Sequence, residues 1–159
     1  YDVNRDGTPE YLGLGEPRMD QRAPLMIWDA AGTPLHRGDD IGGTNNYLRV
    51  GKRNPDDLRP VMVMNSMLGV MDVDVDGKME ILDVANNPMV SRIAFVLYYD
   101  GSVVAYKPEG ATLVEAYKSG KIRFCLTDMA VHGKTLYVAG DEGEILNIAE
   151  GKGRIMWYE

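Results

Sequence analysis

The sequence predicts an all-β protein made of repeated antiparallel units. Short apolar strands recur at regular spacing along the 159 residues, and glycine-rich turns separate them. No segment shows sustained apolar residues at i, i+3, i+4 and i+7 with end caps, so we expect almost no helix. These two observations favour a sandwich, a barrel or a propeller.

A third observation, an acidic loop that occurs twice, organises the repeat. The two copies are Asp2–Glu10 (Asp-Val-Asn-Arg-Asp-Gly-Thr-Pro-Glu) and Asp72–Glu80 (Asp-Val-Asp-Val-Asp-Gly-Lys-Met-Glu), and their first residues are 70 positions apart. Polar side chains at alternate positions, followed by a glycine that permits a sharp turn, can converge on one hard cation. Ca²⁺ is the natural candidate, because it accepts six to eight oxygen ligands in irregular geometry.

We expect three units, at about residues 1–60, 61–123 and 124–159. The first contains strands near Tyr11–Leu14, Leu25–Trp28 and Pro34–Arg37, with a turn at Asp29–Gly32. The second contains strands near Val61–Met64, Gly69–Val73, Met79–Val84, Ile93–Tyr98 and Val103–Lys107. Tyr99–Ser102 holds an Asp-Gly pair, which is a strong hairpin signal. Aligning the two acidic loops brings Met26–Gly32 close to Leu97–Gly101 with a one-residue slip. We interpret Asn86-Asn87, Pro88 and Pro108 as loop markers.

The third unit begins near Phe124 and has lost the acidic loop. Asp128–Lys134 stands where the loop should be but keeps only its first acid, so we predict no metal there. The remaining strands are expected near Thr135–Ala139, Glu144–Ala149 and Arg154–Tyr158.

Composition restricts the partners. The net charge is −7, with 24 acidic and 17 basic residues, which argues against a nucleic-acid partner. No run approaches the ~18–20 apolar residues of a membrane span. The chain starts directly at the first acidic loop and ends within an apolar strand pattern. We therefore expect a segment of a longer chain, with the rest of that chain as its first partner.

Both acidic loops, each followed by a short apolar strand, resemble the FG-GAP/VCBS repeat family. The resemblance implies β-propeller blades, two Ca²⁺ sites and an extracellular, cell-surface or periplasmic location. It also implies side-chain ligands and, at Thr8 and Lys78, main-chain carbonyl ligands; the side-chain ligands are Asp2, Asn4, Asp6, Glu10, Asp72, Asp74, Asp76 and Glu80. About two of the three units match, and three blades cannot close a ring that typically needs four to eight.

The acidic loops allow two other interpretations. An EF-hand needs flanking helices and a bidentate Glu at loop position 12, where this chain has Gly13 and Asp83. The second alternative, solvated acidic turns without a metal, stays open at this point.

No catalytic signature accompanies the loops. His36 and His132 have no second ligand at metal spacing, and no serine lies in a nucleophile context, so we assign no catalytic residue. We expect an adhesion, ligand-binding or assembly module whose partner is a protein or a glycan. The tract Gly38–Arg59, with Tyr47 beside Arg49, is the best candidate for recognition. The alternatives are part of a propeller-fold polysaccharide lyase or hydrolase, and a structural subunit of a surface filament or complex.

Overall fold

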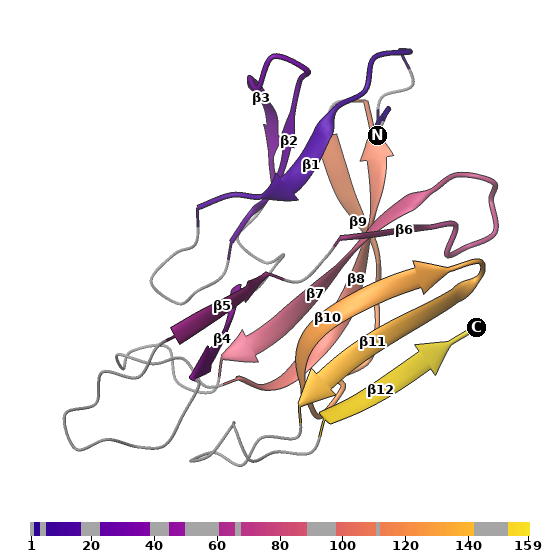
Figure 1. Cartoon of the computed structure of the whole chain (residues 1–159). Coiled ribbons are helices and arrows are strands. Elements are labelled where there is room, and N and C mark those ends of the chain that lie inside the picture. The colour runs from indigo at the N-terminus through magenta and orange to yellow at the C-terminus, as the bar shows by residue number, and fades with distance from the viewer. Residues whose placement is uncertain are drawn as a thin grey trace.

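The computed structural model describes residues 2–3, 6–16, 23–38, 45–49, 61–65, 68–88, 98–110, 112–141 and 153–159. In this part of the chain the regular elements are strands, and every pair is antiparallel (Figure 1). The strands are β1 (Tyr11–Leu14), β2 (Leu25–Trp28), β3 (Pro34–Arg37), β4 (Asn45–Arg49), β5 (Val61–Asn65), β6 (Gly69–Met71), β7 (Glu80–Pro88), β8 (Tyr98–Glu109), β9 (Thr112–Lys118), β10 (Cys125–His132), β11 (Thr135–Asp141) and β12 (Gly153–Tyr158). The all-β prediction is confirmed.

The strands form sheets that follow the order of the chain. β1-β2-β3, β6-β7-β8-β9 and β10-β11-β12 are meanders, and β4-β5 is a two-stranded pair. No closed ring of sheets is formed by the described residues. The same residues contain no helix long and apolar enough to cross a membrane.

The main core lies between the β6–β9 sheet and the β10–β12 sheet, which face one another in Figure 1. β10 contacts β6, β7 and β8. The buried side chains of this core are Leu82, Val84, Val103, Ala105, Leu126, Met129, Leu136 and Val138. Because successive side chains of a strand alternate between its faces, the burial of Ile81 and Asp83 shows that β7 is covered on both faces. The acidic loop therefore leads into a firmly held strand.

The sheets β1–β3 and β6–β9 repeat one pairing pattern. Tyr11 of β1 lies opposite Trp28 of β2, and Ile81 of β7 lies opposite Tyr106 of β8. Tyr11 and Ile81 each follow the last acid of a loop, so the two pairs occupy equivalent places. β1 and β7 are therefore counterparts, and so are β2 and β8.

A register shift at the same point strengthens this equivalence. β2 shifts against β3 between Ile27 and Trp28, and β8 shifts against β9 between Ala105 and Tyr106. Such bulges are specific features of a strand pair rather than random defects. Their recurrence shows that β1, β2 and β3 match β7, β8 and β9, the last three strands of the other sheet.

The registers correct the alignment expected from the sequence. Trp28 and Tyr106 are 78 positions apart (106 − 28), and Gly32 and Gly110, both at positive φ of 85° and 62°, have the same separation (110 − 32). The turn at Asp29–Gly32 is thus equivalent to Lys107–Gly110. The predicted match to Leu97–Gly101 is wrong, because β7 and β8 are longer strands than β1 and β2, so that the paired residues Ile81 and Tyr106 are 25 positions apart (106 − 81) and Tyr11 and Trp28 only 17 (28 − 11).

The hairpin turn predicted at Tyr99–Ser102 is also wrong. Asp100 and Gly101 lie inside β8, which runs on to Glu109. Gly101 exchanges main-chain hydrogen bonds of 2.9 and 2.8 Å with Ile122. A Cβ on Gly101 would stand 2.5 Å from the Asn86 side-chain oxygen and 2.8 Å from Leu126. The glycine is needed there for close packing and not for a turn.

Other loop markers fall within strands for similar reasons. Asn86, Asn87 and Pro88 belong to β7, and Pro108 belongs to β8 near its end. β7 is held through this stretch by its pairing with β8, which overrides the local preference of these residues.

Two further expectations can be compared with the strands. Asp128–His132 continues β10 rather than forming a loop, because it pairs with β11 up to the turn at Gly133. Part of Gly38–Arg59 is β4, and its partner β5 pairs with it rather than with the β6–β9 sheet. The strand expected at Glu144–Ala149 lies outside the described residues.

Candidate metal centre

The first acidic loop closes on its own last carboxylate. Glu10 is buried, and its Oε2 accepts a 2.7 Å hydrogen bond from the main-chain N–H of Val3. Near the tip, Gly7 at φ 90° donates its N–H to Asp2 Oδ2 at 3.0 Å. The Glu10 side chain therefore joins the two ends of the loop, and the Asp2 side chain holds its tip.

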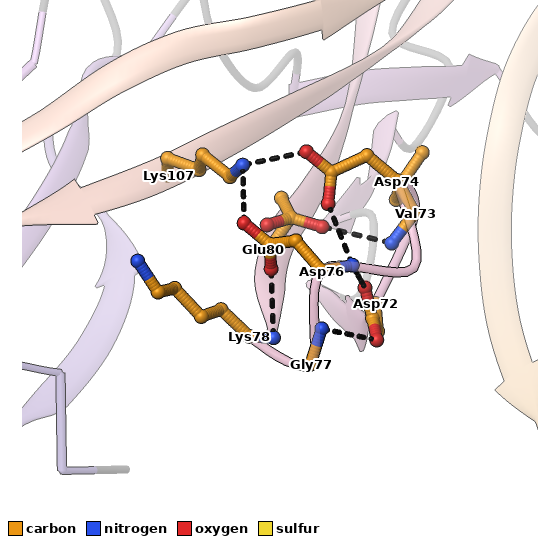
Figure 2. A network of polar contacts seen from close by, with 8 residues as sticks. All are labelled: Asp72, Val73, Asp74, Asp76, Gly77, Lys78, Glu80 and Lys107. Atoms are coloured by element: carbon orange, nitrogen blue, oxygen red, sulfur yellow. Dashed lines mark hydrogen bonds and ion pairs between the residues drawn. The ribbon is translucent and has the colours of Figure 1, made fainter.

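The second loop reproduces these contacts 70 residues later. Glu80 Oε2 accepts from the Val73 N–H at 2.8 Å, and Asp72 Oδ2 accepts from the Gly77 N–H at 3.0 Å (Figure 2). Gly77 has φ 84°. Equal donors, acceptors and glycine conformation show that the two sequence motifs fold in the same way.

The aspartate at the fifth position of each loop forms a local turn. Asp6 Oδ1 accepts from the Thr8 N–H and Asp76 Oδ1 from the Lys78 N–H, both at 2.8 Å. Asx turns of this kind place the carboxylate beside the backbone that follows it.

Three carboxylates converge in each loop. Oxygens of Asp2, Asp6 and Glu10 lie within 4.8 Å of one another, and so do oxygens of Asp72, Asp74 and Glu80. Each set of acids could hold a metal ion. His36 and His132 belong to neither cluster.

The burial of the clusters tests whether a cation fits. Glu80 is only 1% exposed, yet its Oε1 has no hydrogen-bond partner within the described residues. In the first loop Asp2 Oδ1 is likewise buried without one. A buried carboxylate oxygen without a partner, beside other carboxylates, is costly unless a cation or proton compensates it. The donor set therefore fits a metal ion.

The second loop differs from the first through Lys107 of β8. Its Nζ lies 2.8 Å from Asp76 Oδ2 and 2.5 Å from Asp74 Oδ2. The hydrogen bond from Lys107 is the main cause that lowers the pKa of Asp76, and the two carboxylates in turn raise the pKa of Lys107. Figure 2 shows the Lys107 ammonium between the two aspartates.

The structure thus brings together most, but not all, of the predicted ligands. Asp76 is engaged by Lys107 and stands outside the second cluster. Asn4 lies outside the described residues. Thr8 and Lys78, expected to offer carbonyls, lie in the loops and donate their N–H groups to Asp6 and Asp76.

Sequence reasoning missed two residues that matter for the second loop, Lys107 and Val75. Lys107 lies far along the chain, and the pairing of β8 with β7 brings it to the loop. Val75 has φ 61°, a left-handed conformation that is a genuine outlier for a β-branched residue. Its position between Asp74 and Asp76 could have suggested a tight turn, but the motif alone gives no φ value.

No family model matches this chain, and neither a curated protein nor a solved structure matches it.

Proposed function

We propose that this chain is a calcium-stabilised β-repeat module of the FG-GAP/VCBS type, with one Ca²⁺ in each acidic loop. The observation that carries the proposal is the shared hydrogen-bond frame of the loops, in which Glu10 and Glu80 each bind the N–H near the loop start. The buried, unpartnered oxygen of Glu80 supports a cation in the second loop.

The donor chemistry favours Ca²⁺ among common metals. Both clusters consist of carboxylates, with neither His nor Cys, which disfavours zinc and copper. Mg²⁺ demands near-octahedral geometry, whereas Ca²⁺ tolerates the irregular arrangement of a nine-residue loop. Asp2, Asp6 and Glu10 would hold the first ion; Asp72, Asp74 and Glu80, joined by Asp76 once Lys107 is displaced, would hold the second.

The role of the ion is structural. In the second repeat the loop joins β6 to β7, and its carboxylates come from both ends of that connection. A cation would remove the repulsion between them and fix the entry into β7. A ligand that binds only the folded state adds about 2.7 kcal/mol of stability at a hundredfold excess over Kd.

The propeller fold, the extracytoplasmic location and the binding role belong to the same proposal. The four-stranded meander β6-β7-β8-β9 suits a propeller blade, and burial of β7 on both faces suits a sheet stacked between neighbours. The proposal places the module outside the cytoplasm, where Ca²⁺-binding modules commonly have Kd of about 10⁻⁴–10⁻³ M. Rigid sheets that present loops would serve adhesion, binding of a protein or glycan, or assembly.

Calorimetric titration with CaCl2, paired with thermal melting in Ca²⁺ and in EGTA, tests the metal assignment. We expect two bound ions, a higher melting temperature in Ca²⁺, and a much smaller effect of equimolar Mg²⁺. The matched control is the double variant Asp2→Asn, Asp72→Asn, which should lose both effects. Equal melting curves in Ca²⁺ and EGTA, together with no binding heat, would contradict the proposal.

A further inference from the structure

Lys107 occupies the second loop in the manner of a bound cation. Its ammonium bridges Asp74 and Asp76, one of which belongs to the acidic cluster. The side chain of Lys107 is 29% exposed and those of the aspartates are 51% and 34% exposed, so the bridge lies at the loop surface. An ion entering the cluster meets this positive charge on one of its own ligands.

At the position equivalent to Lys107, the first repeat does not have a lysine. The position equivalent to Lys107 is Asp29, whose Oδ1 instead accepts from the N–H groups of Ala31 and Thr33 at 2.9 and 2.7 Å. Asp29 is therefore engaged in its own turn. The two repeats thus differ in charge at this position: Asp29 follows β2 and binds its own turn, whereas Lys107 lies in β8 and binds the second loop.

Lys107 offsets the one additional acid that the second loop has at its predicted ligand positions. At the four side-chain positions the first loop has three acids and Asn4, a charge of −3, whereas the second has four acids, a charge of −4. Lys107 adds +1 to the second, which restores −3. The extra acid is Asp74, and Lys107 binds it directly.

We propose that Lys107 is an internal counter-cation of the second loop, which a divalent ion must displace from Asp74 and Asp76 before all the loop's acids can bind it. The inference rests on the proposed calcium function and adds that the two sites are not equivalent. Lys107 lowers the affinity of the second loop for the ion and stabilises that loop when it is empty.

The expected change in the affinity of the second loop for the ion follows from Coulomb's law. A unit positive charge near a divalent ion, in surroundings close to water, corresponds to about a tenfold change in affinity. Removing Lys107 also leaves Asp74 and Asp76 to repel one another in the empty loop. Loss of the lysine charge and repulsion between the two aspartates both strengthen ion binding once Lys107 is removed. Both effects weaken as salt screens the surface charges.

Calorimetry on the second loop alone tests this role. In an Asp6→Ala background, which disables the first loop, Lys107→Met should bind Ca²⁺ about tenfold more tightly than the parent at low salt. Lys107→Arg keeps the charge and should bind like the parent. Lys78→Met is the matched control, because it removes a lysine whose side chain extends away from Asp72 and Asp74 in Figure 2. Lys78→Met should change the Ca²⁺ affinity clearly less than Lys107→Met does.

Two further measurements complete the test: thermal melting, and Ca²⁺ binding in a chain whose second loop is disabled. Lys107→Met should melt below the parent in EGTA and gain more than the parent from Ca²⁺. In an Asp72→Ala background, where only the first loop binds, it should leave Ca²⁺ affinity unchanged. Unchanged or weaker binding by folded Lys107→Met, or an equal gain from Lys78→Met, overturns the inference while calcium binding stands. Absence of Ca²⁺ binding by the wild-type chain overturns both.

Discussion

The side-chain amide of Asn86 on β7 forms two hydrogen bonds with the main chain of Leu126 on β10. Asn86 Nδ2 donates to the Leu126 carbonyl, and Asn86 Oδ1 accepts from the Leu126 N–H, both at 2.8 Å. Asn86 is 2% exposed and Leu126 is fully buried, so neither main-chain group can turn to water. One side chain thereby joins the β6–β9 sheet to the β10–β12 sheet.

Replacing Asn86 with Ala should be strongly destabilising. The change leaves a buried N–H and carbonyl of Leu126 without these partners, at a cost of about 1–3 kcal/mol for each buried group left unsatisfied. Urea unfolding should show a loss of about 2–4 kcal/mol. The neighbour Asn87 is exposed, so Asn87→Ala should cost under about 1 kcal/mol. Equal losses in the two variants would argue against the Asn86 contact.

Gly101→Ala should destabilise the same junction by overpacking. The new methyl group would meet the Asn86 oxygen and the Leu126 side chain at distances that real contacts do not allow. We expect a loss of about 1–3 kcal/mol in urea unfolding. Gly120 has open space around its Cβ position, so Gly120→Ala should change stability little. A double variant with Asn86→Ala should lose less than the sum, because it removes one of the colliding groups.

The acidic loops could be predicted because all their determinants lie within nine residues. Asp72, Gly77 and Glu80 carry both the turn and the carboxylates, and the same holds for Asp2, Gly7 and Glu10. Strands β1, β2 and β3 were placed correctly for the same reason, since apolar alternation and the Asp29–Gly32 turn are local signals. Convergence of carboxylates then follows from the fold of a short segment.

The junctions between segments could not be predicted in this way. Asp100-Gly101 carries a strong local hairpin signal, but its glycine is fixed by Leu126, a residue of another sheet. Lys107 enters the second loop through the register of β8 on β7, which no local pattern encodes. Register depends on pairing across the whole sheet, so both features emerge only from the three-dimensional structure.

Val75→Asn should stabilise the chain. Val75 holds a left-handed conformation at φ 61° and is largely exposed, so its side chain contributes strain without much packing. Asn adopts this conformation more readily, and we expect a gain of about 1 kcal/mol in urea unfolding. Val114→Asn is the matched control on strand β9, where the change should not stabilise because Val is the better strand former. No gain at position 75 would contradict the strain argument.

Asp29 should make stability depend on pH. Hydrogen bonding, chiefly from the Thr33 N–H, lowers the pKa of Asp29 in the folded chain. A lowered folded pKa means that its contribution is present above the unfolded pKa of about 3.9 and is lost as pH falls through the folded value. The advantage of wild type over Asp29→Asn in urea unfolding should thus be full at pH 6 and shrink below about pH 4. Glu115→Gln controls for the loss of one negative charge, and an advantage that grows on acidification would refute this account.

Glu80→Gln should affect stability differently when the second loop is empty and when it holds Ca²⁺. The amide oxygen can still accept from the Val73 N–H, but the buried charge is lost. In EGTA the variant should melt at or above the wild-type temperature, because an uncompensated buried carboxylate is costly. In Ca²⁺ it should gain less, with an affinity at the second loop at least about tenfold lower. Glu109→Gln, on the exposed end of β8, should match wild type in both media; a full calcium response from Glu80→Gln would count against the site.

The register that puts Lys107 beside Asp74 sets the smallest part of this repeat that can be transplanted. Grafting only Asp72–Glu80 into the first repeat would import a fourth carboxylate, that of Asp74, without the Lys107 ammonium that binds it. A transferable cassette has to run from the loop through β7 and β8 to Gly110, so that acid and lysine travel together. Protein engineers who recombine such repeats should therefore cut after the second strand, not after the loop.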